Sequence, residues 1–192
     1  DAVDAVGSVP LPPYFHGTLD DPERYQTVFA ERTGSAAAPT AGLHFTRDVL
    51  ADLDSRGIAV ASIDLEIGLD TFRPIAATDL ADHRMHRERV IVGEGLVDAV
   101  AAVRASGGRV VAVGTTVVRS LEAAAVSGEL RPMDGHTDLF ITPGYRFRVV
   151  DLMVTNFHVP GSTLIVLVAA FMGGGWRVAY ETALRRGYRF LS

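Results

Sequence analysis

The stretch GRVVAVGTTVVRSLEAAA, residues 108–125, constrains the fold more than any other part of the chain. Its apolar first half is typical of a buried strand, and the residues after the Gly-Thr-Thr turn favour a helix. Strand–turn–helix units of this kind are characteristic of α/β proteins, in which helices cover a sheet. The carboxyl end of such a strand is a common ligand site, because free N–H groups and the dipole at the helix start attract anions.

Helices and strands alternate in the same way through the rest of the chain. The patterns predict helices over 21–34, 47–56, 94–108, 159–174 and 176–186. They predict further strands over 58–67, 137–144 and 145–157, with an irregular, charge-rich segment over 68–92. We therefore expect an α/β fold with a mixed or mainly parallel sheet flanked by helices, in a single domain over residues 1–192.

Composition excludes several kinds of protein. The chain has no cysteine, which excludes disulfides, thiolate zinc sites and a cysteine nucleophile, and is compatible with a cytoplasmic enzyme. The longest apolar run, 164–172, is far shorter than the ~20 residues that span a bilayer, so we expect no membrane association. The net charge is −5 and every basic residue is arginine, which argues against a general nucleic-acid coat but leaves room for a local arginine patch.

The helix start after the Gly-Thr-Thr turn is the first candidate site. Thr115 and Thr116 lie at the carboxyl end of the strand, and Arg119 lies one helical turn further on. The structural alternative is that the threonines only cap the helix while Arg119 and Glu122 form a solvated pair at i, i+3.

A second strand end carries similar side chains. Asn156 and His158 in TNFHVPGST follow an apolar strand and precede an apolar helix. A lone histidine is more often structural, but an asparagine beside it at a second strand end of the same sheet favours a site.

Two further segments contain histidine. In AAPTAGLHFT, residues 37–46, His44 lies between a glycine and a helix start, and the preceding segment supplies Arg24, Tyr25 and Gln26. In DHRMHRE, residues 82–88, two histidines three apart precede a carboxylate. That spacing allows a metal site, but the HExxH zinc pattern is absent, so acid–base or phosphate contacts are favoured and no metal is expected.

These motifs together resemble one family. The matching segments are LPPY (11–14), ERYQTVFA (23–30), AAPTAGLHFT (37–46), the histidines and glutamate of 83–88, AVGTTVVRSLE (112–122), FITPG (140–144), the run 151–164 containing TNFHVPGSTL, and YRFLS (188–192). The chain resembles the S-adenosylmethionine:tRNA ribosyltransferase-isomerases of queuosine biosynthesis over nearly its whole length.

The resemblance implies both a fold and a reaction. The fold is an α/β catalytic domain with an inserted β-barrel domain, and the barrel is absent from these residues. The enzyme transfers and isomerises the ribosyl part of S-adenosylmethionine onto 7-aminomethyl-7-deazaguanine at the tRNA wobble position. The products are epoxyqueuosine in tRNA, adenine and methionine. S-adenosylmethionine is thus a substrate, tRNA is the partner, and we expect a cytoplasmic protein, with a monomer favoured.

The chemistry suggests roles for residues in the matching motifs. A base must remove a proton beside the sulfonium, the attacking amine must be deprotonated, and the departing adenine must be protonated, which suits histidine near neutral pH. The catalytic candidates are His44, His158, His83, His86 and Glu66. The candidates for binding S-adenosylmethionine are Gly114, Thr115, Thr116, Arg119, Asn156 and Phe45. The candidates for binding the tRNA or its base are Tyr14, Arg24, Tyr25, Gln26 and Arg73.

The sequence departs from the family pattern in two ways. In DLEIGLDTF, residues 64–72, Glu66 stands where the family has histidine and Asp70 where it has glycine. The chain also begins with Asp1 and reaches LPPY at residue 11, so we expect a piece of a longer or processed protein. Two alternative functions follow: a diverged S-adenosylmethionine enzyme acting on a small molecule, or a non-catalytic remnant that binds nucleoside or RNA.

Overall fold

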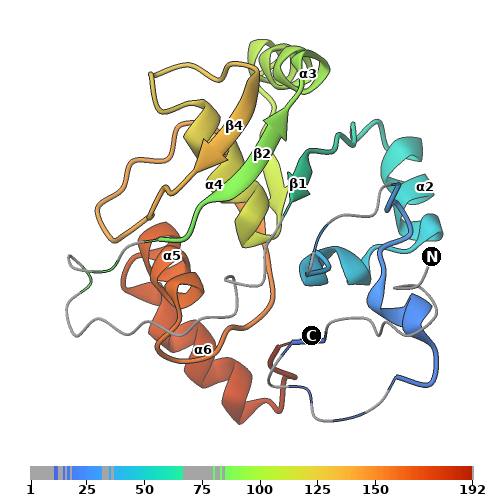
Figure 1. Ribbon diagram of the computed structural model, residues 1–192, viewed down its shortest axis with the longest axis vertical. Coiled ribbons are helices and arrows are strands. Elements are labelled where there is room, and N and C mark those ends of the chain that lie inside the picture. The colour runs from blue at the N-terminus through green and yellow to red at the C-terminus, as the bar shows by residue number, and fades with distance from the viewer. Residues whose placement is uncertain are drawn as a thin grey trace, which may run out of the picture.

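The computed structural model describes residues 11–12, 15, 17, 19–31, 35, 37–66, 80, 83, 85–191 of the chain. Tyr14, Asp70 and Arg73 lie outside the described residues. Figure 1 shows the elements in chain order. They are the 3-10 helices η1 (Pro22–Tyr25) and η2 (Thr40–His44), then α2 (Arg47–Ser55), β1 (Asp64–Glu66), β2 (Glu88–Val92), α3 (Glu94–Ala105), β3 (Val111–Val113), α4 (Thr115–Ala124), β4 (Met133–Thr137), β5 (Leu152–Val154), α5 (Thr163–Met172) and α6 (Gly175–Arg185).

The strands form two small sheets, which confirms the α/β fold in its mixed form. One sheet has the order β1-β2-β4 and is antiparallel throughout. The other pairs β3 with β5 in parallel, with Val111 opposite Leu152 and Val113 opposite Val154. Parallel pairing among the described residues is therefore confined to β3 and β5, and the mainly parallel alternative is wrong.

Helix α4 connects the two sheets, because it contacts β3 of one and β2 and β4 of the other. In Figure 1 it runs behind β2 and β4. Val118 and Leu121 of this helix are buried in the main core, with Ile141 and Leu167. The helix that follows the Gly-Thr-Thr turn is thus also the centre of the fold.

Local capping signals locate the helices well. Thr46 accepts a hydrogen bond from the Val49 N–H at 3.2 Å and caps α2, and Ser162 caps α5 through the Ile165 N–H at 3.4 Å. Gly107 follows α3 with a φ of 74°, a left-handed conformation that suits glycine at a helix end.

The helix predicted over 21–34 is wrong beyond its first turn. Asp21 caps η1 as expected, since its Oδ1 accepts from the Glu23 N–H at 3.0 Å. The helix ends at Tyr25, and the Gln26 side chain then accepts the Thr27 N–H. Thr27 is buried and Phe29 lies against η2, so packing onto η2 replaces the helical path.

The predicted strand over 58–67 is also largely wrong among its described residues. Only Asp64–Glu66 pair with β2, and Ile58 and Val60 are exposed. Conversely, the segment expected to be irregular contains β2, the central strand of its sheet, whose Glu88, Val90 and Val92 are buried. A charged residue at a buried position concealed this strand from the apolar pattern.

The strand predicted over 137–144 is wrong as well. The strand in this region is β4, and residues 138–144 have no regular structure. The Leu139 carbonyl accepts the Arg119 Nε–H at 3.1 Å, so a side chain takes the place of a neighbouring strand. The predicted Pro143-Gly144 turn is confirmed: the Tyr145 N–H donates to the Thr142 carbonyl at 3.0 Å, and Gly144 has a φ of 97°.

Helices α5 and α6 close the domain beside the sheets (Figure 1). Within the described residues, no single helix is long and apolar enough to cross a membrane. The two helices pass such a test only as a pair, and they are bent by 114° at their junction.

Candidate active site

Three segments that the sequence marked separately meet at the carboxyl ends of the parallel strands. The Gly114 N–H donates to the Val154 carbonyl at 2.8 Å, which brings the start of α4 beside the end of β5. Helix η2 covers this point: a Cβ added to Gly114 would lie 3.9 Å from the Ala41 Cβ. The segments AAPTAGLHFT, AVGTTVVRSLE and TNFHVPGST are therefore neighbours in space.

A chain of side chains joins two of these segments. The Asn156 Nδ2 donates to the Thr40 Oγ1 at 3.0 Å, and the Asn156 Oδ1 lies 3.3 Å from the His44 Nε2. In this amide orientation the Asn156 oxygen, which is an acceptor, faces the His44 Nε2. His44 is exposed, so the ring is held in one orientation while remaining accessible.

The start of α4 supplies positive potential next to this chain. Gly114 occupies the cap position with a φ of 96°, and no side chain caps the helix. Thr115 is buried and Thr116 half-buried. The first N–H groups of the ten-residue helix thus suit an anionic group such as a carboxylate.

His158 is buried rather than accessible. Burial lowers the pKa of His158 to about 4, so the ring is neutral at pH 7. The Tyr180 hydroxyl accepts the His158 backbone N–H at 3.1 Å and lies 3.4 Å from Nδ1, while Thr155 Oγ1 lies 3.4 Å from Nε2. This environment suits a histidine that holds the 155–158 segment, and with it Asn156, in place.

A second group lies one turn along α4. Arg119 is buried, and its Nη1 donates to the Glu88 Oε2 at 2.7 Å. The other oxygen of Glu88 lies 2.7 Å from the His86 Nε2. Burial lowers the pKa of Arg119, and the charge of Glu88 opposes that shift. Among the described residues, the buried Nη2 of Arg119 has no hydrogen-bond partner.

The alternative pairing of Arg119 with Glu122 is wrong, because both residues are buried with other partners. Glu122 is fully buried, and its carboxylate accepts the backbone N–H groups of 148–150 together with the Tyr145 hydroxyl. It therefore fixes the loop before β5 and contributes nothing to the Arg119 group.

The two remaining catalytic candidates, His83 and Glu66, contact other partners. The His83 ring packs edge-on against Phe140 at 5.2 Å between centroids. Glu66 accepts from the Arg89 Nη1 at 3.1 Å, and Asp134 accepts from the same guanidinium. The exposed Asp134 and Glu66 raise the pKa of Arg89. Glu66 thus belongs to a surface ladder across β1, β2 and β4.

No group of three or more His, Asp or Glu side chains in the described part of the chain is arranged to hold a metal ion. The described residues that line the grooves along α3 and α6 include no predicted site residue.

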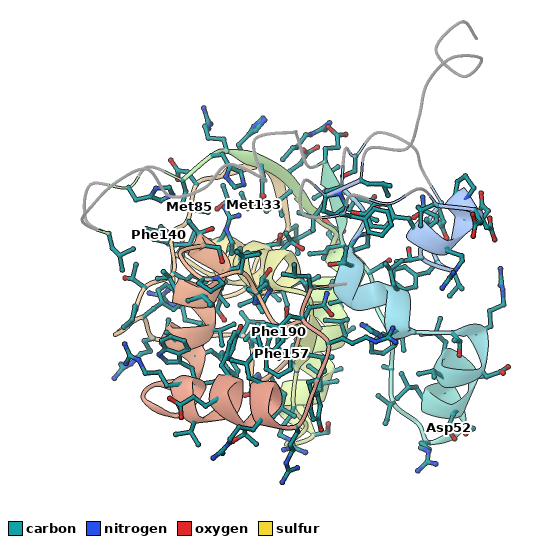
Figure 2. All side chains as sticks on the ribbon, turned by 90° about the horizontal axis from the view of Figure 1, so that it is seen from below. Asp52, Met85, Met133, Phe140, Phe157 and Phe190 are labelled. Atoms are coloured by element: carbon teal, nitrogen blue, oxygen red, sulfur yellow. The ribbon has the colours of Figure 1, made fainter. Side chains whose placement is uncertain are left out.

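The candidates for RNA contact lie next to η2. Arg24 and Gln26 are exposed and Tyr25 is half-buried, and η1 contacts η2. Phe45 is half-buried at the end of η2. Figure 2 shows the labelled Met85 and Phe140 on one side of the molecule and Asp52 of α2 on the opposite side.

Gly42 has a packing role that the sequence did not reveal. A Cβ at this position would lie 2.9 Å from the Phe29 ring and 3.1 Å from the Thr27 Cγ2. The glycine therefore lets η2 pack closely on the preceding segment.

Sequence reasoning missed three supporting residues. Thr40 stood inside a marked motif and was the easiest to find. Tyr180 lies on α6, 22 residues from His158, and no local pattern connects the two. Glu88 stood in the matching segment 83–88 but was given no role of its own, and its burial against Arg119 has no local signal.

The arrangement is that of an α/β domain in which an uncapped helix start and an amide lie at adjacent strand ends, the place where open α/β sheets commonly bind ligands. A family model described as queuosine biosynthesis protein matches residues 1–192, and the chain belongs to that family. The resemblance found in the motifs is thereby confirmed.

Comparisons with individual proteins point to the same family. Proteins named S-adenosylmethionine:tRNA ribosyltransferase-isomerase from Synechococcus elongatus and from another Synechococcus strain are each 50% identical over 188 residues, which is 97% of this chain and 52% of the relative. The crystal structure of an S-adenosylmethionine tRNA ribosyltransferase from Thermotoga maritima is similar with a TM-score of 0.66 at 41% identity, over 80% of this chain and 49% of that one. The chain thus spans about half the length of the relatives it matches.

Proposed function

We propose that this chain is part of an enzyme that transfers and isomerises the ribosyl group of S-adenosylmethionine onto 7-aminomethyl-7-deazaguanine at the wobble position of tRNA. The products are epoxyqueuosine in tRNA, adenine and methionine. Family membership over the whole chain supports the reaction. The observation that carries it at the level of residues is the contact of His44 with Asn156 beside the uncapped start of α4.

In this proposal His44 is the proton carrier. Its ring is accessible, and Asn156 holds it with Nε2 as donor and Nδ1 as acceptor. The sulfonium acidifies a C–H proton on the neighbouring ribose carbon. A histidine ring nitrogen with a lone pair is suited to accept that proton near neutral pH. His158 is too deeply buried for that role, and it supports Asn156 instead.

The helix start binds the carboxylate of the methionine part. The N–H groups after Gly114 and the hydroxyls of Thr115 and Thr116 are the donors. Asn156 is the candidate for contact with the ribose hydroxyls. The half-buried Phe45 offers an aromatic face to the sulfonium. Arg119 is engaged by Glu88, so it supports the site from beneath rather than binding the carboxylate directly.

The tRNA approaches over η1, which contacts η2, carries the exposed Arg24 and is followed by the exposed Gln26. Tyr25, Tyr14 and Arg73 remain predictions for contact with the tRNA or its base. A tRNA substrate places the protein in the cytoplasm, and a monomer is the state we favour.

The test is adenine release by the full natural protein that contains this chain. It is incubated with S-adenosylmethionine alone, with tRNA bearing the aminomethyl base, and with the free aminomethyl base. The proposal predicts release only with the tRNA. Release with the free base instead supports the small-molecule alternative. Binding of S-adenosylmethionine or tRNA without adenine release supports the non-catalytic alternative and contradicts the proposal.

A further inference from the structure

We propose that Glu88 is a positioning residue for His86: its buried carboxylate, locked by Arg119, fixes the His86 ring as the Nε2–H tautomer and makes Nδ1 the proton acceptor. A role for His86 in catalysis rests on the proposed function. The tautomer itself rests only on the arrangement of the three side chains.

The three side chains form a short series of hydrogen bonds. The His86 Nε2 and Glu88 Oε1 are 2.7 Å apart, and the Glu88 Oε2 accepts the Arg119 Nη1 at 2.7 Å. The Arg119 Nε in turn donates to the Leu139 carbonyl. Side-chain exposure rises from 1% at Glu88 and 4% at Arg119 to 23% at His86. The hydrogen bonds therefore connect buried side chains in the core to a ring that solvent or substrate can reach.

The contact with Glu88 determines our assignment of the ring. A guanidinium only donates, and an ionised carboxylate only accepts. With Arg119 on one oxygen, Glu88 faces His86 with an acceptor, so the neutral ring must carry its proton on Nε2. A proton taken up at Nδ1 then makes an imidazolium whose charge the carboxylate stabilises. The carboxylate keeps its own charge throughout, because the proton stays on the ring.

Stability alone is a weak reason for such a pair. Well-packed apolar residues in place of a buried ion pair are often neutral or stabilising, because both charges lose hydration. Arg119 also follows Thr115 by one turn on the same face of α4, and both are buried. The helix that presents its start to the His44–Asn156 group thus carries the anchor of His86.

The substitution Glu88→Gln gives an unusual prediction. Arg119 still requires an acceptor, so the Gln oxygen stays with Arg119 and the Gln NH2 turns toward His86. An NH2 group demands an acceptor at Nε2, which moves the ring proton to Nδ1. The variant is therefore expected to invert the His86 tautomer while preserving the shape of the side chain.

The test is a long-range proton–nitrogen NMR correlation of the full natural protein at about pH 8.5, where imidazole side chains are generally neutral. His86 is assigned from the spectrum of His86→Gln. We expect the Nε2–H tautomer in the wild type and the Nδ1–H tautomer in Glu88→Gln, with no change in Glu94→Gln, an exposed control. A wild-type ring in the Nδ1–H form overturns the proposal even if Glu88→Gln does not fold, and so does a variant that keeps the Nε2–H form.

Kinetics separate positioning from simple stability. Glu88→Gln should lower kcat for adenine release by about 10-fold or more with KM for S-adenosylmethionine changed less than about twofold, since the loss falls on the transition state. In a His86→Ala background the same change should have no further effect on kcat. Equal losses in both backgrounds contradict the role through His86. Absence of adenine release from the wild type, with the tautomers as expected, refutes the proposed function and leaves the positioning intact.

Discussion

The Asn156 side chain bridges two residues of η2, donating to the Thr40 Oγ1 at 3.0 Å while its oxygen lies 3.3 Å from the His44 Nε2. The bridge spans more than a hundred residues of sequence, since His44 and Asn156 are 112 positions apart. It ties the helix that carries His44 to the end of β5, where α4 also begins. The orientation of the proposed proton carrier therefore depends on a residue from another part of the chain.

Asn156→Ala should reduce activity far more than stability. The exposed His44 ring loses the acceptor that holds it, so kcat for adenine release is expected to fall about 10- to 100-fold, a barrier increase of about 1.4–3 kcal/mol. The free energy of unfolding should fall by about 1 kcal/mol, because the amide is only half-buried. Asp52→Asn on exposed α2 is the control and should leave both unchanged. Full activity in Asn156→Ala would show that the bridge is not needed for the reaction.

Gly42→Ala should destabilise the protein through overpacking. Its Cβ would lie 2.9 Å from the Phe29 ring, and the free energy of unfolding should fall by about 1–3 kcal/mol in chemical denaturation. Gly95→Ala on α3 meets nothing within 4 Å and should leave stability unchanged or raise it by up to about 1 kcal/mol. Adding Phe29→Leu should restore part of the loss at Gly42. A stable single variant contradicts the packing described for η2.

We predict that the free energy of unfolding falls in acid because His158 is buried in its neutral form. Burial lowers the pKa of His158 from an ordinary 6.5 to about 4, so the unfolded chain binds a proton more readily than the folded one. The stability from the neutral ring is complete above pH 6.5 and declines as the pH falls toward 4, by about 3 kcal/mol at pH 4. The measurement is the difference in unfolding free energy between wild type and His158→Gln across this window, which removes contributions from other titrating groups. A difference that does not vary with pH would place His158 in a solvated environment.

Glu122→Gln should destabilise the folded protein strongly, although it only replaces one carboxylate oxygen by an NH2 group. The carboxylate accepts backbone N–H groups of 148–150 on both oxygens, so an NH2 group at either position faces a donor. Because the residue is fully buried, the free energy of unfolding is expected to fall by about 3 kcal/mol. Glu129→Gln, exposed after α4, should change it by less than about 0.5 kcal/mol. An unaffected Glu122→Gln protein would mean that the loop before β5 is held by other contacts.

The parts of the fold that local signals specify were predictable from sequence. Thr46 and Ser162 mark the starts of α2 and α5, and Gly107 marks the end of α3, each through local conformation or contacts within a few residues. The strand–turn–helix at 108–125 carries its own apolar period and is confirmed as β3 and α4. The three marked motifs also meet where the strand-end rule expects them.

The sequence predictions fail where contacts between residues far apart in the chain determine the structure. β2 begins with Glu88, a charge that is buried only because Arg119 faces it from α4. The helix predicted after Asp21 yields to packing of Thr27 and Phe29 on η2. The neutral state of His158 depends on burial beside Tyr180 of α6. Periodicity and spacing along the chain contain none of this information, since each contact joins segments far apart in sequence.

The most direct test of the proposed function is the nucleoside composition of the acceptor tRNA after reaction. Acceptor tRNA incubated with the full natural protein and S-adenosylmethionine is digested, and its modified nucleosides are identified by mass spectrometry. We predict that the wild type converts the aminomethyl-deazaguanine nucleoside to epoxyqueuosine and that Asn156→Ala does so about 10-fold or more slowly. An acceptor nucleoside that remains unmodified, while the Synechococcus elongatus relative converts it in a parallel reaction, would contradict it.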